Sequence, residues 1–166
     1  MLASSLFVFL ALLASAVSAV TLYRGDTRGP AKIKESGGFY ARGNHDDHEN
    51  YGGTVFEHVT KSLKYPSKDP YISTSIDIEA AKKHGESKYL YHLDRDQIEE
   101  NIIDVAAAYA DDGKTYPYPN EKEFSVEYHI PWEAITKVER NVKGQWRSIK
   151  FSKRGVELFD EGVFVD

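Results

Sequence analysis

The chain contains no cysteine and only one methionine among its 166 residues. Small exported domains commonly depend on disulfides, so this chain has to be held together by its apolar core alone. No Asn-x-Ser/Thr sequon occurs, and we therefore expect no N-glycosylation. Basic residues are also too few for a polyanion-binding protein. The chain has 21 basic and 26 acidic residues, which gives a net charge of -5. This balance argues against nucleic-acid partners and against attachment to anionic lipid.

Long apolar runs are absent except at the N terminus. Residues 1–19 are rich in Leu, Phe, Val and Ala and end in Val17-Ser18-Ala19, the small-residue pattern of a secretory cleavage site. The run is too short to span a bilayer, and no Lys or Arg precedes it, which leaves a buried N-terminal helix as the alternative. We predict a signal peptide over 1–19, secretion without stable membrane association, and a single domain over 20–166. Removing 19 of 166 residues leaves 147, a typical domain length.

Short apolar runs separated by turn residues predict an α+β domain. Gly25-Asp26 should end the first strand, and residues 102–109 fit either a strand or a helix. Residues 111–120 should form a loop. We expect strands over 20–24, 71–76, 89–93 and 121–128, and short helices over 30–36, 54–63 and 77–84.

The predicted strand over 121–128 carries unusual carboxylates. Residues two apart on a strand share a face, which groups Glu121, Glu123, Ser125 and Glu127. The opposite face is mostly apolar and should enter the core. Repulsion between neighbouring Glu121 and Glu123 should raise the pKa of one of them, and such a pair can divide acid and base roles. A solvated strand face is the alternative interpretation.

Two further elements carry candidate polar groups. On the strand over 71–76, Ser73 and Ser75 share a face, where hydroxyls can bind a carboxylate or a ligand amide. The alternative is that Ser75 or Asp77 caps the following helix. Arg24 can fork onto a phosphate or carboxylate, although a single Arg at a strand end is more often a surface residue.

The histidines near residue 45 fit either a metal site or a solvated loop. His45-Asp46-Asp47-His48 contains suitable ligand types, but no further ligand motif of recognised spacing accompanies it. A solvated loop is favoured, and we predict no metal.

The order of these motifs resembles the arginine–serine–glutamate class of ADP-ribosyltransferases, closest to the A subunits of cholera toxin and the heat-labile enterotoxins. An early strand carries Arg24, a central strand carries Ser73-Thr74-Ser75, and a late strand carries Glu121-Lys122-Glu123. The flanking agreement runs from about Tyr23 to Ile135 and is thin over 44–70. It includes residues 22–30, 33–38, Arg42-Gly43, Ile130-Pro131 and Ile135.

The resemblance implies a fold of two small, packed, mostly antiparallel sheets with flanking helices and an NAD cleft. It implies catalytic roles for four residues: Glu123 at the ribose, Ser73 orienting Glu123, Arg24 supporting the NAD phosphates, and Glu121 at the acceptor. His58 corresponds to a family histidine near the cleft. The implied cofactor-binding set is Tyr23, Arg24, Gly25, Asp26, Arg42, His58, Ser73, Thr74 and Ser75.

The resemblance further implies a secreted, toxin- or effector-like mono-ADP-ribosyltransferase that modifies an arginine of a host protein. Family members with Gln in place of the first Glu favour other acceptors, so Glu121 points to arginine. The loop over 111–120, with Tyr116 and Tyr118, should help choose the target. The chain shows no pentamer-docking tail, and the need for a protein activator and action inside a target cell stay open. Alternatives are an NAD glycohydrolase and a silent binding effector on the same fold.

Overall fold

The computed structural model describes residues 20–42, 51–84 and 86–150. The predicted signal peptide and the segment from His45 to His48 lie outside these residues. No helix within the described ranges is long and apolar enough to cross a membrane.

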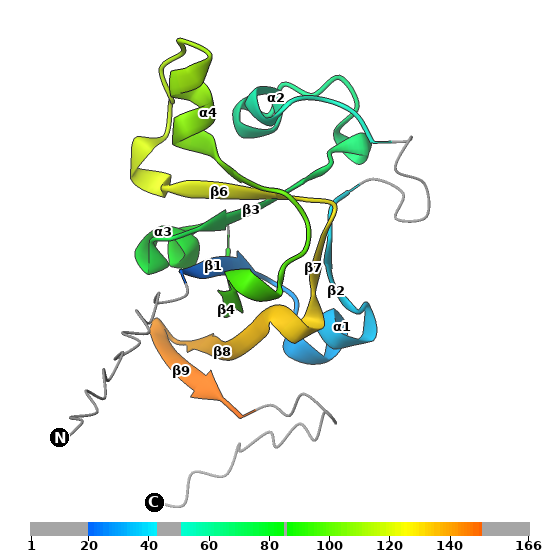
Figure 1. Cartoon of the computed structure of the whole chain (residues 1–166). Coiled ribbons are helices and arrows are strands. Elements are labelled where there is room, and N and C mark those ends of the chain that lie inside the picture. Colours follow the sequence, from blue (N-terminus) through cyan, green and yellow to red (C-terminus); the bar gives the residue numbers. More distant parts are fainter. Residues whose placement is uncertain (1–19, 43–50, 85, 151–166) are drawn as a thin grey trace, which may run out of the picture.

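A seven-stranded antiparallel sheet forms the centre of the molecule (Figure 1). Its strand order is β5-β6-β3-β1-β4-β8-β9. The join between β3 and β1 rests on one register pair, Tyr23 opposite Ser75, so the sheet divides into a three-stranded and a four-stranded part. The strands are β1 Thr21–Asp26, β3 Tyr71–Ser75, β4 Tyr89–Asp94, β5 Ile102–Asp104, β6 Glu123–Glu127, β8 Ile135–Val142 and β9 Gln145–Ile149. A second, two-stranded sheet pairs β2 Gly38–Tyr40 with β7 His129–Pro131.

Short helices flank the sheets, and local signals fix their ends. Thr54 and Glu57 form a reciprocal capping box at the start of α2, and the Asp77 carboxylate caps α3. The α-helices are α1 Pro30–Glu35, α2 Val55–Thr60, α3 Ile78–Lys83 and α4 Val105–Asp111. Single 3-10 turns cover Pro66–Lys68, Arg95–Gln97, Pro119–Glu121 and Trp132–Ala134.

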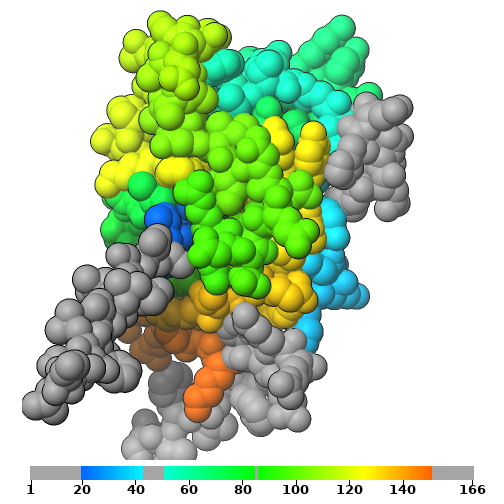
Figure 2. Space-filling view, viewed as in Figure 1, coloured from blue at the N-terminus to red at the C-terminus, as the bar shows by residue number. Residues whose placement is uncertain are grey.

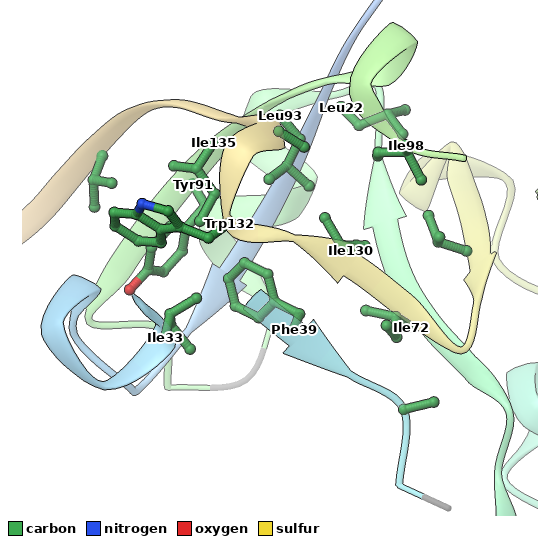
Figure 3. Close-up of a cluster of buried hydrophobic side chains, with 14 residues drawn as sticks. Leu22, Ile33, Phe39, Ile72, Tyr91, Leu93, Ile98, Ile130, Trp132 and Ile135 are labelled. Carbon is green, nitrogen blue, oxygen red and sulfur yellow. The ribbon is translucent and has the colours of Figure 1, made fainter. Parts of the chain in front are cut away.

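Two apolar clusters stabilise this arrangement. The larger lies between the four-stranded part and the small sheet, where Phe39, Tyr91, Ile130 and Trp132 pack together (Figure 3). The smaller joins α2 to α4 at one end of the molecule (Figures 1 and 2), and the rings of Phe56 and Tyr109 meet there edge to face at 4.8 Å. Burial of these side chains supplies the stability that disulfides give other small domains.

The expected α+β class is confirmed, and three local expectations need correction. Gly25 and Asp26 continue β1 instead of ending it. The ambiguous segment 102–109 is both a strand and a helix, because β5 leads directly into α4. The late strand begins at Glu123 instead of at Glu121.

Candidate active site

The β3–β6 pairing places hydroxyls and a carboxylate on one face of the sheet. Ser75 lies opposite Glu123, and Ser73 lies opposite Ser125. Residues directly opposite on paired strands share a face, so these four side chains form a polar group. It is buried, since Ser125 is 0% and Glu123 is 7% exposed. The interpretation of this face as a solvated surface is therefore wrong at Glu123.

Glu121 precedes the strand that carries Glu123 and is not part of it, which corrects the expected arrangement. It ends the 3-10 turn Pro119–Glu121, and Lys122 follows with a φ of 44°, in the left-handed region. The Ser75 hydroxyl donates to the Glu121 carbonyl oxygen over 2.6 Å, which ties this turn to β3. The Glu121 side chain is exposed at the turn, whereas the Glu123 side chain points into the fold. The two carboxylates are therefore not neighbours on one strand face.

The Glu123 carboxylate receives several hydrogen bonds. The Ser125 hydroxyl donates to Oε1 over 3.2 Å, and the Tyr116 hydroxyl donates to Oε2 over 3.4 Å. His58 Nε2 lies 3.5 Å from Oε1. Burial raises the pKa of Glu123, but hydrogen bonds from His58 and Ser73 outweigh it and hold the pKa below its usual value. The expected repulsion-raised pKa is thus wrong here, and Glu123 is an anion.

His58 connects this carboxylate to a second one. Its Nδ1 lies 2.7 Å from Asp69 Oδ2, and its Nε2 lies 2.8 Å from the Ser73 hydroxyl. Burial lowers the pKa of His58, but its contacts with Asp69 and Glu123 raise the pKa to about 9. Asp69 is not among the predicted site residues, because an aspartate before a proline in a turn carries no recognisable functional pattern.

Arg24 lies on β1 beside the same group. Its Nη1 donates to the Ser73 carbonyl oxygen over 2.7 Å, and its Nη2 lies 3.3 Å from Asp26 Oδ2. Asp26 is also bound by Arg28, at 2.8 Å. The side chain of Arg24 is only 19% exposed, so the interpretation as an ordinary surface residue is wrong. Its Nε is buried and finds no hydrogen-bond partner among the described residues.

Two hollows meet at these residues. One has a volume of about 300 Å³ and the other of about 680 Å³. The residues common to both are Arg24, Ser73, Lys83, His84, Glu121 and Glu123. The smaller hollow is also lined by Tyr23, Gly25, Thr74 and Ser75, and the larger by Arg42, His58, Asp69 and Tyr118. The structure thus brings every predicted catalytic residue, and all of the predicted cofactor-binding residues except Asp26, to the lining of two adjoining cavities.

Some of the predicted site residues also have structural roles that the sequence did not indicate. The Thr74 hydroxyl donates to the Phe124 carbonyl oxygen over 2.6 Å, so it fastens β3 to β6. A Cβ at Gly25 would lie 2.3 Å from the Ala81 carbonyl oxygen, so glycine lets α3 approach β1. Asp26 holds the two guanidinium groups described above.

A buried anion beside a hollow can stabilise positive charge that develops on a substrate, because its field is little screened there. Within the described residues no group of three or more metal-ligating side chains could hold a metal ion. The charged groups that this site offers a substrate include Glu123 and the nearby Arg24.

Comparison with known proteins places the chain in a family. The model of the heat-labile enterotoxin alpha chain family matches residues 3–150. The chain is 32% identical over 143 residues to the NAD(+)–arginine ADP-ribosyltransferase Chelt of Vibrio cholerae, a match that covers 80% of this chain and 23% of Chelt. The chain belongs to the heat-labile enterotoxin alpha chain family. It spans about half or less of the length of the curated relatives it matches.

Solved structures show the same fold. A guanine-specific ADP-ribosyltransferase is 29% identical with a TM-score of 0.58, covering 78% of this chain and 71% of that one. Scabin toxin from Streptomyces scabies, solved in complex with NADH, is 26% identical with a TM-score of 0.58, covering 77% of this chain and 68% of that one. The chain therefore has the ADP-ribosyltransferase fold expected from its motifs.

Proposed function

We propose that this chain is a mono-ADP-ribosyltransferase that moves ADP-ribose from NAD to an arginine of a target protein. The observation that carries the proposal is the buried, anionic Glu123 carboxylate, held in place at the junction of two hollows. The names of Chelt and of the guanine-specific ADP-ribosyltransferase support the reaction class. Scabin in complex with NADH supports a dinucleotide as the ligand, with NAD as the co-substrate here.

The chemistry follows from the positions of the carboxylates. When the bond between nicotinamide and ribose breaks, the ribose carbon gains oxocarbenium character, and nicotinamide leaves with the electron pair. Glu123 stabilises that positive charge more in the transition state than in the ground state. Ser73 keeps Glu123 oriented through the contacts that both make with His58.

Glu121 is suited to the acceptor. It is exposed and lines both hollows, so an incoming side chain can reach it. A guanidinium group has a pKa above about 12 and is a poor nucleophile until it loses a proton. A carboxylate beside it can position it and take that proton as the new bond to the ribose carbon forms.

The dinucleotide would be held by the predicted cofactor-binding residues. Arg24 lines both hollows, and its permanently charged guanidinium suits a phosphate group there. Arg42 adds a further cation to the larger hollow. Tyr23, Gly25, His58, Ser73, Thr74 and Ser75 line the walls around them.

We also propose where this activity takes place and what kind of target it meets. We infer a signal peptide over 1–19, one catalytic domain over 20–166, and secretion as a toxin or effector that meets a host protein as its target. The half-exposed ring of Tyr118, at 45% exposure beside the larger hollow, offers that target an aromatic contact.

The decisive experiment incubates the chain from Val20 onward with NAD and a small guanidine compound. Nicotinamide release and labelling of the guanidine are followed together. We expect both products from the wild type, and a loss of both by about 100-fold or more in Glu123→Gln, the usual scale for removing one preorganised charge. Glu121→Gln should lose labelling while nicotinamide release continues.

Glu127→Gln is the matched control, since Glu127 lies on the same strand and lines neither hollow. Guanosine is tested as a parallel acceptor because one solved relative is named guanine-specific. Release without labelling of either acceptor would favour a glycohydrolase. A wild type that binds NAD without releasing nicotinamide would contradict the proposal and favour a binding effector.

A further inference from the structure

We propose that Asp69 is a positioning residue of this site, which acts through the His58 ring to hold the Glu123 carboxylate in place. The contacts among these three side chains come from three separate elements: the turn before β3, helix α2 and strand β6. The consequence for turnover rests on the function proposed above for Glu123, whereas the contacts themselves do not.

Asp69 is buried and uses both of its carboxylate oxygens. Its side chain is 10% exposed; Oδ1 accepts from the Tyr71 backbone N–H over 3.0 Å, and Oδ2 lies 2.7 Å from His58 Nδ1. The first contact fixes the carboxylate relative to β3, and the second fixes the ring relative to the carboxylate. The opposite edge of the ring, Nε2, then faces Ser73 at 2.8 Å and Glu123 at 3.5 Å.

This geometry requires a carboxylate at position 69 for two reasons. Two N–H donors converge on the side chain, and an asparagine has only one side-chain oxygen to offer them. Asparagine also lacks the negative charge that favours the doubly protonated ring. With asparagine at 69, the amide can donate to an unprotonated Nδ1, and the ring becomes neutral at lower pH.

Other charged and titratable groups around His58 also influence its pKa. The Tyr71 ring packs against the His58 ring, with 5.5 Å between the centroids. The other charged or titratable groups that line the larger hollow with His58 are Arg24, Arg42, Lys61, Lys83, His84 and Glu121. The cations oppose protonation of the ring, whereas the carboxylates of Asp69 and Glu123 favour it at closer range. The pKa of His58 rises to about 9 despite burial, in agreement with the dominance of the two contacting carboxylates.

Protonated His58 gives Glu123 a fixed partner. An imidazolium directs an N–H toward the Ser73 and Glu123 side chains, and this keeps Glu123 ionised and in one orientation. Once the ring loses its proton, the charge that holds Glu123 is gone. We therefore expect the rate of nicotinamide release to fall at alkaline pH as His58 deprotonates, at a pH that Asp69 sets.

The test measures His58 directly and turnover separately. The pKa of the His58 ring is read by NMR on histidine-labelled protein, with the signal assigned by its loss in His58→Gln. The pH dependence of kcat/KM for nicotinamide release is measured from pH 5.5 to 9.5 in the same variants. Asp69→Asn is compared with the wild type, with Asp69→Glu and with Asp94→Asn. Asp94 is a matched control because its Oδ1 also accepts from the backbone N–H two residues ahead, over 3.1 Å.

We expect Asp69→Asn to lower the pKa of His58 by about one pH unit or more, the usual scale for losing an adjacent opposite charge. The alkaline limb of kcat/KM should move by the same amount, which is a loss of about fivefold at pH 9 for a shift of one unit. Asp69→Glu should return both toward the wild type, and Asp94→Asn should leave both unchanged.

Three results would overturn the proposal. An unchanged His58 titration in Asp69→Asn would show that the two groups are not coupled. A lowered His58 pKa with an unmoved alkaline limb would separate His58 from the reaction. An equal loss of rate at every pH would indicate a structural role alone. If the wild type released no nicotinamide, the proposed function would fail, and the NMR titration would still decide whether Asp69 controls His58.

Discussion

We propose that Arg24 serves both the fold and a ligand. Its Nη1 binds the Ser73 carbonyl oxygen, across the narrow join between β1 and β3, while its Nε is left without a partner among the described residues. A guanidinium can bind a protein carbonyl oxygen and a ligand at the same time because its donors point in different fixed directions. An ammonium group concentrates its donors at one point.

We predict that Arg24→Lys binds NAD about tenfold more weakly or worse, because the lysine keeps the charge and cannot reach both partners. Titration calorimetry with NAD measures the change. Arg140→Lys is the control, since Arg140 is an exposed residue of β8 and lines neither hollow. Equal NAD affinity in Arg24→Lys and the wild type would contradict a role for this guanidinium in holding the dinucleotide.

Among elements, the contact of α3 with β1 explains why the strand continues through a glycine. A Cβ at Gly25 would lie 2.2 Å from the Ser87 hydroxyl oxygen and 2.3 Å from the Ala81 carbonyl oxygen. The second atom belongs to the α3 backbone and cannot turn away. Sequence rules treat glycine as the end of a strand, whereas here it allows a helix to pack closely.

We predict that Gly25→Ala lowers the free energy of unfolding by about 1–3 kcal/mol, the usual cost of forcing extra volume into a packed contact. Urea denaturation followed by circular dichroism gives the value. Gly52→Ala is the control, because a Cβ there would meet no atom within 4 Å. A wild-type midpoint for Gly25→Ala would show that α3 can move away at little cost, in which case the lining of the smaller hollow should change.

At the scale of the whole molecule, the His58 contacts make stability depend on pH. The pKa of His58 is raised from 6.5 to about 9 on folding, so its contribution is fully present below pH 6.5 and is lost as the pH rises through 9. The pKa of Glu123 is lowered from 4.5, so its contribution is present above pH 4.5 and is lost as the pH falls below that. These two groups together stabilise the fold most between pH 4.5 and 6.5.

We predict that the difference in unfolding free energy between the wild type and His58→Gln shrinks as the pH rises from 6.5 to 9.5. Comparing the two proteins cancels the contribution of other groups, such as His92, whose pKa is lowered chiefly by burial. Chemical denaturation at intervals of half a pH unit follows the trend. A difference that stays constant across this range would mean that His58 does not lose a stabilising proton there.

The amino-acid sequence was enough to predict the α+β class and most of the residues that line the site. Arg24, Ser73 and Glu123 could be chosen because the order of their motifs resembles that of a known family. Periodicity grouped Ser73 with Ser75 on one face of β3, and Glu123 with Ser125 on one face of β6. Such patterns are local, and local patterns survive in the sequence.

The position of Glu121, the role of Asp69 and the charge of Glu123 depend on contacts between elements far apart in the sequence. The turn at Lys122 separates Glu121 from Glu123 because Ser75, on another strand, ties down the carbonyl oxygen of Glu121. Asp69 joins the site because α2 folds over the start of β3, and the charge of Glu123 is settled by side chains from two other elements. Burial and long-range contact fix these features, and neither can be read from the spacing of residues along one segment.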